Sequence, residues 1–371
     1  MLINKLQKRW KRSGSIALSL LIMLSLVLSV GCNKNETEPS DEVTTQTSEK
    51  ATITTPETTP EETEPQVENA GQYSRLNGQP MDEDMVNRRI LAVTLDNHPN
   101  ARPQAGLRQA DIVFEMKVEG TYTRYLAFFQ SEDPEIVGSI RSARDCFLDR
   151  NVEFNTCYAH FGGSYLALQR IEQYQYSDLN GMTNASGAMY RNGDTGKSSP
   201  HNVYADVAKL RQQMTDTGED FDVEFAGYSF NVEPVAPAGG ETAEQITIQY
   251  ASDNQTRYEY DTETGKYFRF KDGVKDIDEN DGDPLLVENI IIQKAASYIH
   301  PAPLRTIEQI GSGEGFFVSR GKYIPITWEK STEMGQTYYY TQENDEFVQI
   351  KLNPGQTWIQ VVDPDTPLSF E

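Results

Sequence analysis

The residues of this sequence best suited to chemistry are two arginines placed where a strand gives way to a helix. Arg141 and Arg144 lie three residues apart in the stretch 136–144, which reads as a strand followed by a helix start. The guanidinium group is planar, and its forked N–H donors fit carboxylate and phosphate groups. In so acidic a chain, such arginines are either ligand clamps or structural ion-pair partners. The sequence leaves both interpretations open.

A second strand-to-helix turn carries two glycines. In the stretch 157–168, a predicted strand runs into Gly162 and Gly163, and Ser164 can cap the helix that follows. Backbone N–H groups and the positive end of the helix dipole would then point at one spot, which favours an anion. The same pattern also occurs as an ordinary tight turn before a capped helix.

Two further side chains, those of Glu115 and His201, could act as an acid or a base. Glu115 and Glu119 alternate with apolar residues and therefore share one face of a predicted strand. His201 precedes Asn202, which we expect to cap a helix. Each has an ordinary alternative, namely the solvated face of a sheet and a simple loop histidine. His98 reads as a turn residue.

The sequence gives little support to metal chemistry. The stretch 276–282 is similar to a calcium loop, but its glycine is one place late and Val287 stands where glutamate is needed. It suits a hairpin loop instead. Cys146 and Cys157 have apolar neighbours and are expected in the core, although an exported chain permits a disulfide. The four histidines are scattered, so no zinc spacing exists, and we expect no metal and no cofactor.

The first 32 residues have the layout of a bacterial export signal. Basic residues precede an apolar run of 15 residues, Ile16 to Val30. As a helix this run would rise about 22 Å, short of a bilayer core of about 30 Å. The stretch from Leu28 to Cys32 resembles a lipobox, although Ser29 stands where an aliphatic residue is usual. We expect lipid attachment at Cys32 and a place on the extracellular face of the cytoplasmic membrane; a cleaved signal or a retained anchor is the alternative.

The negative charge of the chain is divided between a tether and a folded part. The net charge is −23, and five basic residues lie in the signal, so the remainder carries −28. Residues 33–72 hold ten acidic and two basic residues, ten threonines and four prolines. Such a stretch cannot bury enough apolar surface to fold, so a disordered acidic tether is expected. The −20 left on residues 73–371 argues against binding to nucleic acid.

Two domains are expected after the tether, because the remaining 299 of 371 residues exceed what one core usually serves. Strands are predicted at 89–96, 111–119, 123–130 and 155–161, and helices over 144–154, 164–174 and 202–214. This alternation over 73–228 predicts a domain with a mixed α/β sheet. Residues 229–243 contain prolines and glycines and read as a linker. Short strands separated by turns over 244–371 predict an antiparallel β domain, so the fold class is α+β or α/β.

Ordered motifs in both predicted domains resemble one family. In the first domain they are 92–107, 110–115, 118–127, 138–144, 160–164 and 200–202, and in the second 288–293, 311–315, 327–328 and 352–359. They are similar to the YerB-type lipoproteins, domain of unknown function 3048, over nearly all of 86–363. The resemblance implies a Gram-positive surface lipoprotein of two modules and supplies no reaction. Cys146 stands at a departure from the family's pattern, where a Tyr-Phe pair is common.

The resemblance also implies a set of polar site residues, which we expect to form one site: Glu115, Arg124, Arg141, Arg144, His160, Ser164, His201 and Asn202. Three functions stay open. In the first, the chain binds a polar or anionic cell-envelope ligand, such as a peptidoglycan or glycan fragment. Alternatively, it is an envelope hydrolase or transferase with Glu115 or His201 as general base. As a third alternative, it is a scaffold that docks a cell-wall synthesis or division protein.

Overall fold

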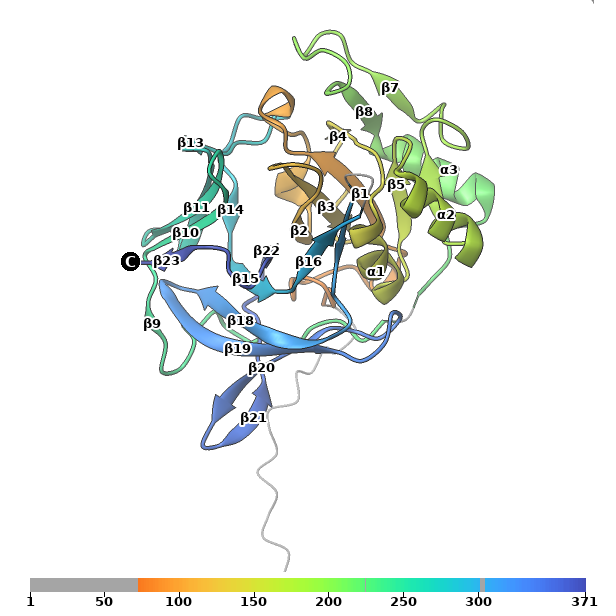
Figure 1. The fold of residues 1–371 in the computed structure, drawn as a ribbon. Coiled ribbons are helices and arrows are strands. Elements are labelled where there is room, and N and C mark those ends of the chain that lie inside the picture. Colours follow the sequence, from red (N-terminus) through yellow and green to blue (C-terminus); the bar gives the residue numbers. More distant parts are fainter. Residues whose placement is uncertain (1–72, 224, 301–303) are drawn as a thin grey trace, which may run out of the picture. The chain divides into compact units, whose positions relative to one another are not determined.

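A computed structural model describes residues 73–223, 225–300 and 304–371 (Figure 1). The predicted export signal, the predicted lipid-attachment residue Cys32 and the predicted tether 33–72 lie outside these residues. Among the helices of the described part, none combines the length and the apolar character needed to cross a membrane.

The described residues fold mostly into β-sheet and include three α-helices, α1 (Asp145–Glu153), α2 (Tyr165–Tyr174) and α3 (Val207–Thr217). Three short 3-10 helices, η1 (Glu83–Met85), η2 (Pro99–Ala101) and η3 (Leu107–Gln109), lie in the connections. All three α-helices belong to the N-terminal part, where the sheet is mixed, whereas the C-terminal part is largely antiparallel. The predicted α+β fold class is therefore confirmed.

One large mixed sheet runs through both parts of the chain, in the order β21-β20-β19-β18-β15-β22-β2-β3-β1-β5-β6, with β9 paired to β19. Its N-terminal strands are β1 (Leu91–Asp96), β2 (Ile112–Lys117), β3 (Thr123–Phe129), β5 (Cys157–His160) and β6 (Asp178–Asn180). Its C-terminal strands are β9 (Glu241–Thr242), β15 (Asn289–Lys294), β18 (Gly311–Ser319), β19 (Lys322–Lys330), β20 (Tyr338–Glu343), β21 (Glu346–Gln349) and β22 (Thr357–Val362).

The join between the two parts is a parallel strand pair. Strand β2 pairs with β22 from Ile112 opposite Thr357 to Met116 opposite Val361. Strand β22 also pairs in parallel with β15, so the C-terminal part is not antiparallel throughout. The division into two domains at 229–243 stays a prediction.

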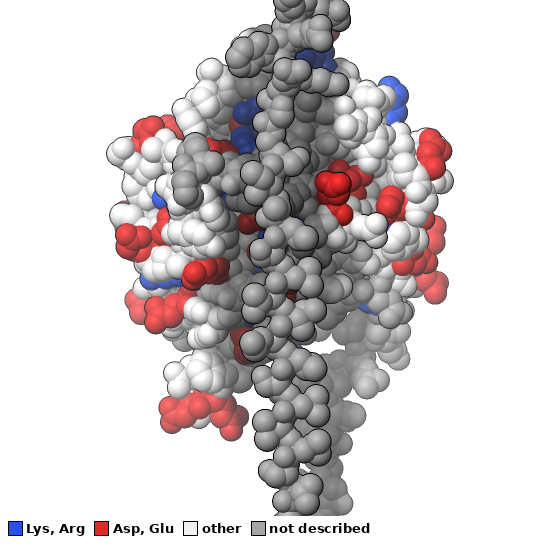
Figure 2. All heavy atoms as spheres, turned by 45° about the vertical axis from the view of Figure 1, so that its right-hand side comes forward, with Lys and Arg blue, Asp and Glu red and all other residues white. Residues whose placement is uncertain are grey.

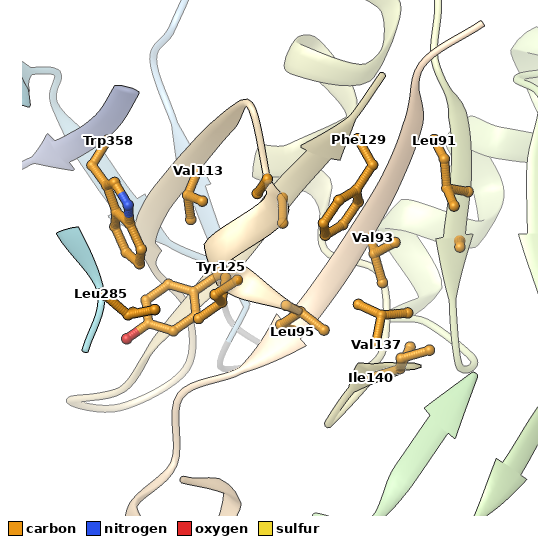
Figure 3. Packing of buried hydrophobic residues seen from close by; sticks show 14 of the residues in the cluster. Leu91, Val93, Leu95, Val113, Tyr125, Phe129, Val137, Ile140, Leu285 and Trp358 are labelled. Carbon is orange, nitrogen blue, oxygen red and sulfur yellow. The ribbon is translucent and has the colours of Figure 1, made fainter. Parts of the chain in front are cut away.

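A six-stranded antiparallel sheet covers one face of the large sheet. It consists of β10 (Gln245–Ala251), β11 (Asn254–Asp261), β12 (Lys266–Lys271), β13 (Val274–Lys275), β14 (Leu286–Val287) and β23 (Leu368–Phe370). Figure 3 shows the core between the sheets, where Trp358 and Leu285 lie near Val113 and Tyr125, and Leu91 and Phe129 continue the same layer. Alternation along the strands places these side chains on one face.

Helices α1 and α2 belong to the opposite face of the large sheet. Phe147 of α1 and Ile171 of α2 pack in a second core with Phe114 and Phe128, which alternate with the residues of the first core. Cys146 lies in this core and Cys157 in the other, and both are free, as their apolar neighbours predict.

Two small sheets complete the described fold. One has the order β4-β8-β7, from β4 (Ile136–Gly138), β7 (Met189–Arg191) and β8 (Val203–Asp206), and the other pairs β16 (Ser297–Ile299) with β17 (Arg305–Ile307). The helix predicted from residue 202 is therefore wrong in its first turn, because Val203 to Asp206 pair with both neighbouring strands. The cap of α3 is Asp206, whose side chain accepts a hydrogen bond from Lys209 N, and not Asn202.

Candidate functional site

The carboxyl ends of strands β1 and β5 lie at one edge of the large sheet, because these two strands run parallel. Strand β3 runs antiparallel to β1, so its first residues lie at the same edge, and Arg124 stands opposite Asp96 in register. His160 is the last residue of β5. Side chains from strand ends and from the loops that follow them meet at such an edge, where α/β proteins commonly bind ligands.

Asp96 connects two of the predicted site residues. Its Oδ2 atom lies 2.7 Å from Nδ1 of His201 and 3.1 Å from Nε of Arg141. The backbone N–H of Arg141 donates to the carbonyl of Thr94, which fixes this arginine over the end of β1. The hydrogen bond from His201 Nδ1 to a carboxylate orients the ring and leaves its Nε2 atom for other contacts.

His98 borders the His201 ring, and Tyr122 borders His98 in turn. The His98 ring is stacked on that of His201 with 4.4 Å between ring centroids, and the centroid of the Tyr122 ring lies 4.8 Å from that of His98. Nδ1 of His98 accepts a hydrogen bond from Asn100 N, so His98 caps a 3-10 helix as well as packing on the site. Partial burial lowers the pKa of His98, and the neighbouring His201 lowers it further.

A second group at the edge is formed by Glu119 between two arginines. Nε of Arg144 pairs with Glu119 Oε1, and Nη2 of Arg124 lies 3.7 Å from Oε2 of the same carboxylate. Arg124 also donates to the carbonyl of Ser142 at 2.9 Å. Burial lowers the pKa of Arg124 to about 10, and the positive charge of Arg144 contributes to this.

The two strand-to-helix turns identified in the sequence lie side by side. Backbone N of Ser164 donates to the carbonyl of Ala143 at 3.1 Å, and Ala143 N donates to Gly162 O at 2.9 Å. Ser164 caps α2 as predicted, since its hydroxyl accepts a hydrogen bond from Ala167 N. The loop with the arginines and the glycine turn therefore form one surface.

The remaining predicted residues at this edge have contacts within the protein. His160 is fully buried, and its ring nitrogens face Gly162 O at 2.7 Å and Asp178 Oδ2 at 3.0 Å. Asn202 accepts a hydrogen bond from Nη1 of Arg191 at 3.0 Å. Both residues support the loops around the site.

Glu115 lies on the other face of the sheet, apart from the seven residues at the edge. It is fully buried between the two sheets, with its carboxylate 2.5 Å from Nη2 of Arg269 and 3.0 Å from Nζ of Lys271. Although burial alone would raise its pKa, these two cations lower the pKa of Glu115 to about 2. A carboxylate held in this way is inaccessible to a ligand and a weak proton acceptor at neutral pH.

The buried Glu115 nevertheless supports the site from behind. Asn97, the residue after Asp96, donates from Nδ2 to Glu115 Oε1 at 3.1 Å and to Thr123 Oγ1 at 2.7 Å. Arg102 in turn donates from Nε to the side-chain oxygen of Asn97 at 3.0 Å. The chain leaving β1 is thus held by a hydrogen-bond network that reaches strand β12.

Asp96, His98 and Glu119 lie at the site but are not among the predicted site residues. The sequence pattern indicated only a strand face shared with Glu115 for Glu119 and a turn for His98. One signal was present, because Asp96 ends a predicted strand at the edge where Arg141 and Ser164 were expected.

The calcium-like stretch has a structural role in the described fold. Asp278 is fully buried and accepts hydrogen bonds from Gly106 N and Arg108 N, both at 3.0 Å. The side chain of Arg108 pairs with Asp281 and Asp283. These carboxylates therefore hold the loop before β2 onto the β12–β14 region.

Fold and site define an α+β protein with a basic, polar cluster at one edge of a mixed sheet. The N-terminal and C-terminal domain models of the family described as "Protein of unknown function (DUF3048)" match residues 76–220 and 246–359. The chain belongs to this family, as its motifs predicted.

Two comparisons with individual proteins agree. The chain is 32% identical to "Putative lipoprotein YerB" of Bacillus subtilis strain 168 over 300 residues, which cover 78% of this chain and 86% of that protein. It is also similar to the crystal structure of YerB from Bacillus subtilis, with a TM-score of 0.71 and 30% identity over 80% of this chain and 99% of the other.

Proposed function

We propose that this protein is a lipid-anchored binding protein of the cell envelope whose site recognises an anionic group of an envelope ligand. The site is the edge cluster, which we define as Asp96, Glu119, Arg124, Arg141, Arg144 and His201. The observation that carries the proposal is the meeting of three arginines over the ends of β1 and β5.

The charge balance of the edge cluster favours an anion. Among the described residues, the carboxylates within ion-pair distance of Arg124, Arg141 and Arg144 are Asp96 and Glu119. Three positive and two negative charges leave one positive charge in excess before either histidine is protonated. The rest of the protein is acidic, and carboxylates are spread over the face shown in Figure 2. A positive site in a negative surface selects its ligand by charge.

A carboxylate or a phosphate group suits this geometry. The side chains of Arg141 and Arg144 are 20% and 15% exposed, so both can be reached from the solvent. Arg124 is more deeply buried and acts mainly as support. Peptidoglycan fragments carry carboxylates and other envelope polymers carry phosphates, so a ligand of either kind fits the site.

Lipid attachment at Cys32 places the site outside the membrane in this proposal. The lipobox-like stretch before Cys32 supports it, and so does the word lipoprotein in the name of the Bacillus subtilis relative. The extracellular face of the cytoplasmic membrane is the corresponding location.

A second candidate function is catalysis, which the His201–Asp96 pair favours. A histidine oriented by a carboxylate at 2.7 Å can accept a proton at Nε2, and the adjacent arginines can stabilise developing negative charge. In this form of the enzyme hypothesis His201 is the general base, Asp96 orients its ring, and Glu115 takes no part in the reaction. It predicts turnover of a cell-wall substrate that His201→Ala abolishes while binding is retained.

The test is calorimetric titration of the protein with inorganic phosphate, with acetate and with a soluble muropeptide. Arg144→Gln should weaken binding of the recognised anion roughly ten- to a hundredfold, because one charge-assisted hydrogen bond contributes about 1.5–3 kcal/mol. The matched control is Arg257→Gln, which removes a partly exposed arginine of β11 that pairs with Glu259. Equal binding by the wild type and Arg144→Gln would refute the site.

A further inference from the structure

A groove with exposed aromatic side chains lies away from the edge cluster. Its volume is about 840 Å³, within the range of about 300–1,000 Å³ typical of ligand pockets. Its walls come from the end of α1, the chain between α2 and β6, the segment after α3 and the β19–β20 connection. We call it the aromatic groove and define it by Tyr174, Tyr176, Phe221, Phe225, Met334 and Tyr338.

The apolar residues of the aromatic groove are unusually exposed. Tyr174 is 52% exposed, Phe221 47% and Met334 78%. The rings of Tyr174 and Tyr176 are stacked with centroids 5.6 Å apart and interplanar angle 16°. Exposed aromatic residues and a flexible methionine that line one groove are typical of surfaces that bind other proteins.

The groove residue Phe221 stands in an acidic stretch of the chain, directly between Asp220 and Asp222. Residues 212–223 contain Asp216, Glu219, Asp220 and Asp222 and neither lysine nor arginine. Of these, Asp216, Asp220 and Asp222 are exposed. Arg89, which also lines the groove, is paired with Glu219 and so adds no free positive charge.

A neighbouring cavity extends the same charge pattern. It has a volume of about 640 Å³ and shares Tyr174 and Glu333 with the aromatic groove. There, Arg170 pairs with three carboxylates, those of Asp145, Asp149 and Glu333. Burial opposes ionisation of Arg170, but hydrogen bonds with Asp149 and Asp145 outweigh it and raise its pKa. One cation among three anions leaves two negative charges in excess.

We propose that the aromatic groove docks an extended segment of a partner polypeptide in which an aromatic or aliphatic anchor is flanked by lysine or arginine. The anchor would fill the space between Tyr174 and Phe221, and the basic residues would face the acidic stretch. Cations also gain from the faces of exposed tyrosines. A neutral glycan could stack on the same rings but would gain nothing from the charge. The inference is independent of the edge cluster.

The experiment uses two fluorescent peptides that share a central Leu-Trp-Leu, one flanked by lysines and the other by glutamates. The lysine peptide should bind, with an affinity that falls as ionic strength rises, and the glutamate peptide should not. Phe221→Ala should weaken binding of the lysine peptide about tenfold, or ~1.4 kcal/mol. Met334→Ser should act in the same direction without touching the core.

The control is Phe347→Ala, which removes a ring that is 67% exposed on β21 and should leave binding unchanged. Melting temperatures of all variants are compared first. The proposal is overturned if the lysine peptide fails to bind, if Phe221→Ala and Met334→Ser bind it as tightly as wild type, or if chitotetraose binds and displaces it without a dependence on salt. The last result would assign the groove to a glycan.

Discussion

One oxygen atom of Asp96 holds both His201 and Arg141, with 2.7 Å to the histidine Nδ1 and 3.1 Å to the arginine Nε. Three segments of the chain meet at this carboxylate: the end of β1, the connection from β4 to α1, and the residues before β8. Because the imidazole and the guanidinium share one carboxylate, the two side chains lie side by side at one point of the edge cluster.

The first prediction is that anion binding strengthens as the pH falls. Protonation of His98 adds positive charge to the site, so a bound anion and a bound proton favour each other. The pKa of His98 is below the ordinary value of about 6.5, so the gain in anion affinity from its protonation should develop below that pH. The other charged groups facing it are Asp96, Arg102 and Arg141.

Sulfate is the appropriate probe because its charge is constant over this range. Its affinity is measured by calorimetry at about pH 7.5 and about pH 5.5. His98→Gln should reduce the increase at the lower pH. An affinity that is independent of pH in the wild type would contradict the coupling.

The second prediction concerns Glu115, whose carboxylate neutralises two buried cations. Glu115→Gln should lower the free energy of unfolding by about 3–5 kcal/mol, because Arg269 and Lys271 would lose their buried counter-charge. Urea denaturation followed by circular dichroism measures this loss. Glu119→Gln, which changes a partly exposed carboxylate, is the matched control and should cost far less.

The same residue predicts a pH dependence of stability. The pKa of Glu115 is about 2 in the folded protein, below its ordinary value of 4.5. The contribution of ionised Glu115 to the free energy of unfolding is therefore complete above pH 4.5 and is lost as the pH falls from 4.5 towards 2. Glu115→Gln should lack this part of the acid-induced loss. A variant that loses stability with acid as steeply as the wild type would show that Glu115 is not the group responsible.

Local parts of the fold could be predicted from the sequence, whereas contacts between residues far apart in the chain could not. Strand β3 and helix α2 follow from local patterns, and so does the cap at Ser164. The pairing of β2 with β22 does not, because the two strands are separated by more than half of the chain. Alternation of apolar and polar residues shows which face of a strand is buried, but it does not show which strand pairs with it.

The same limit applies to the site residues. The strand-to-helix turns were recognisable, because glycine and the capping serine have local signatures. The position of Glu115 was not, since its partners Arg269 and Lys271 lie in β12 and join it only when the two sheets pack. Alternation placed Glu115 and Glu119 on one face, but the strand ends at Lys117, so Glu119 is free to reach Arg144.

The third prediction is that Asp278 is structural. Asp278→Ala should lower stability by about 1–3 kcal/mol, because Gly106 N and Arg108 N would lose their acceptor. Thermal melting in the presence and absence of millimolar calcium provides the measurement. We expect calcium to leave the melting temperature of the wild type unchanged. A calcium-dependent increase that Asp278→Ala abolishes would assign a metal to this loop.

The fourth prediction is that Cys32 carries the membrane anchor. Cys32→Ala should move the protein from the detergent phase to the aqueous phase in a phase-partition experiment on whole cells, since the acyl chains would be missing. Cys146→Ala serves as the control for loss of a cysteine elsewhere. If Cys32→Ala partitions with the membrane as the wild type does, the apolar run is retained as the anchor.

Anion binding at the edge cluster is tested most directly by the structure of the protein with a soluble muropeptide or phosphate bound. We expect an anionic group within hydrogen-bond distance of the guanidinium groups of Arg141 and Arg144, close to His201 and the start of α2. Arg144→Gln crystals treated in the same way should show this position empty. Ligand density elsewhere, with the edge cluster unoccupied in the wild type at a saturating ligand concentration, would contradict the proposed function.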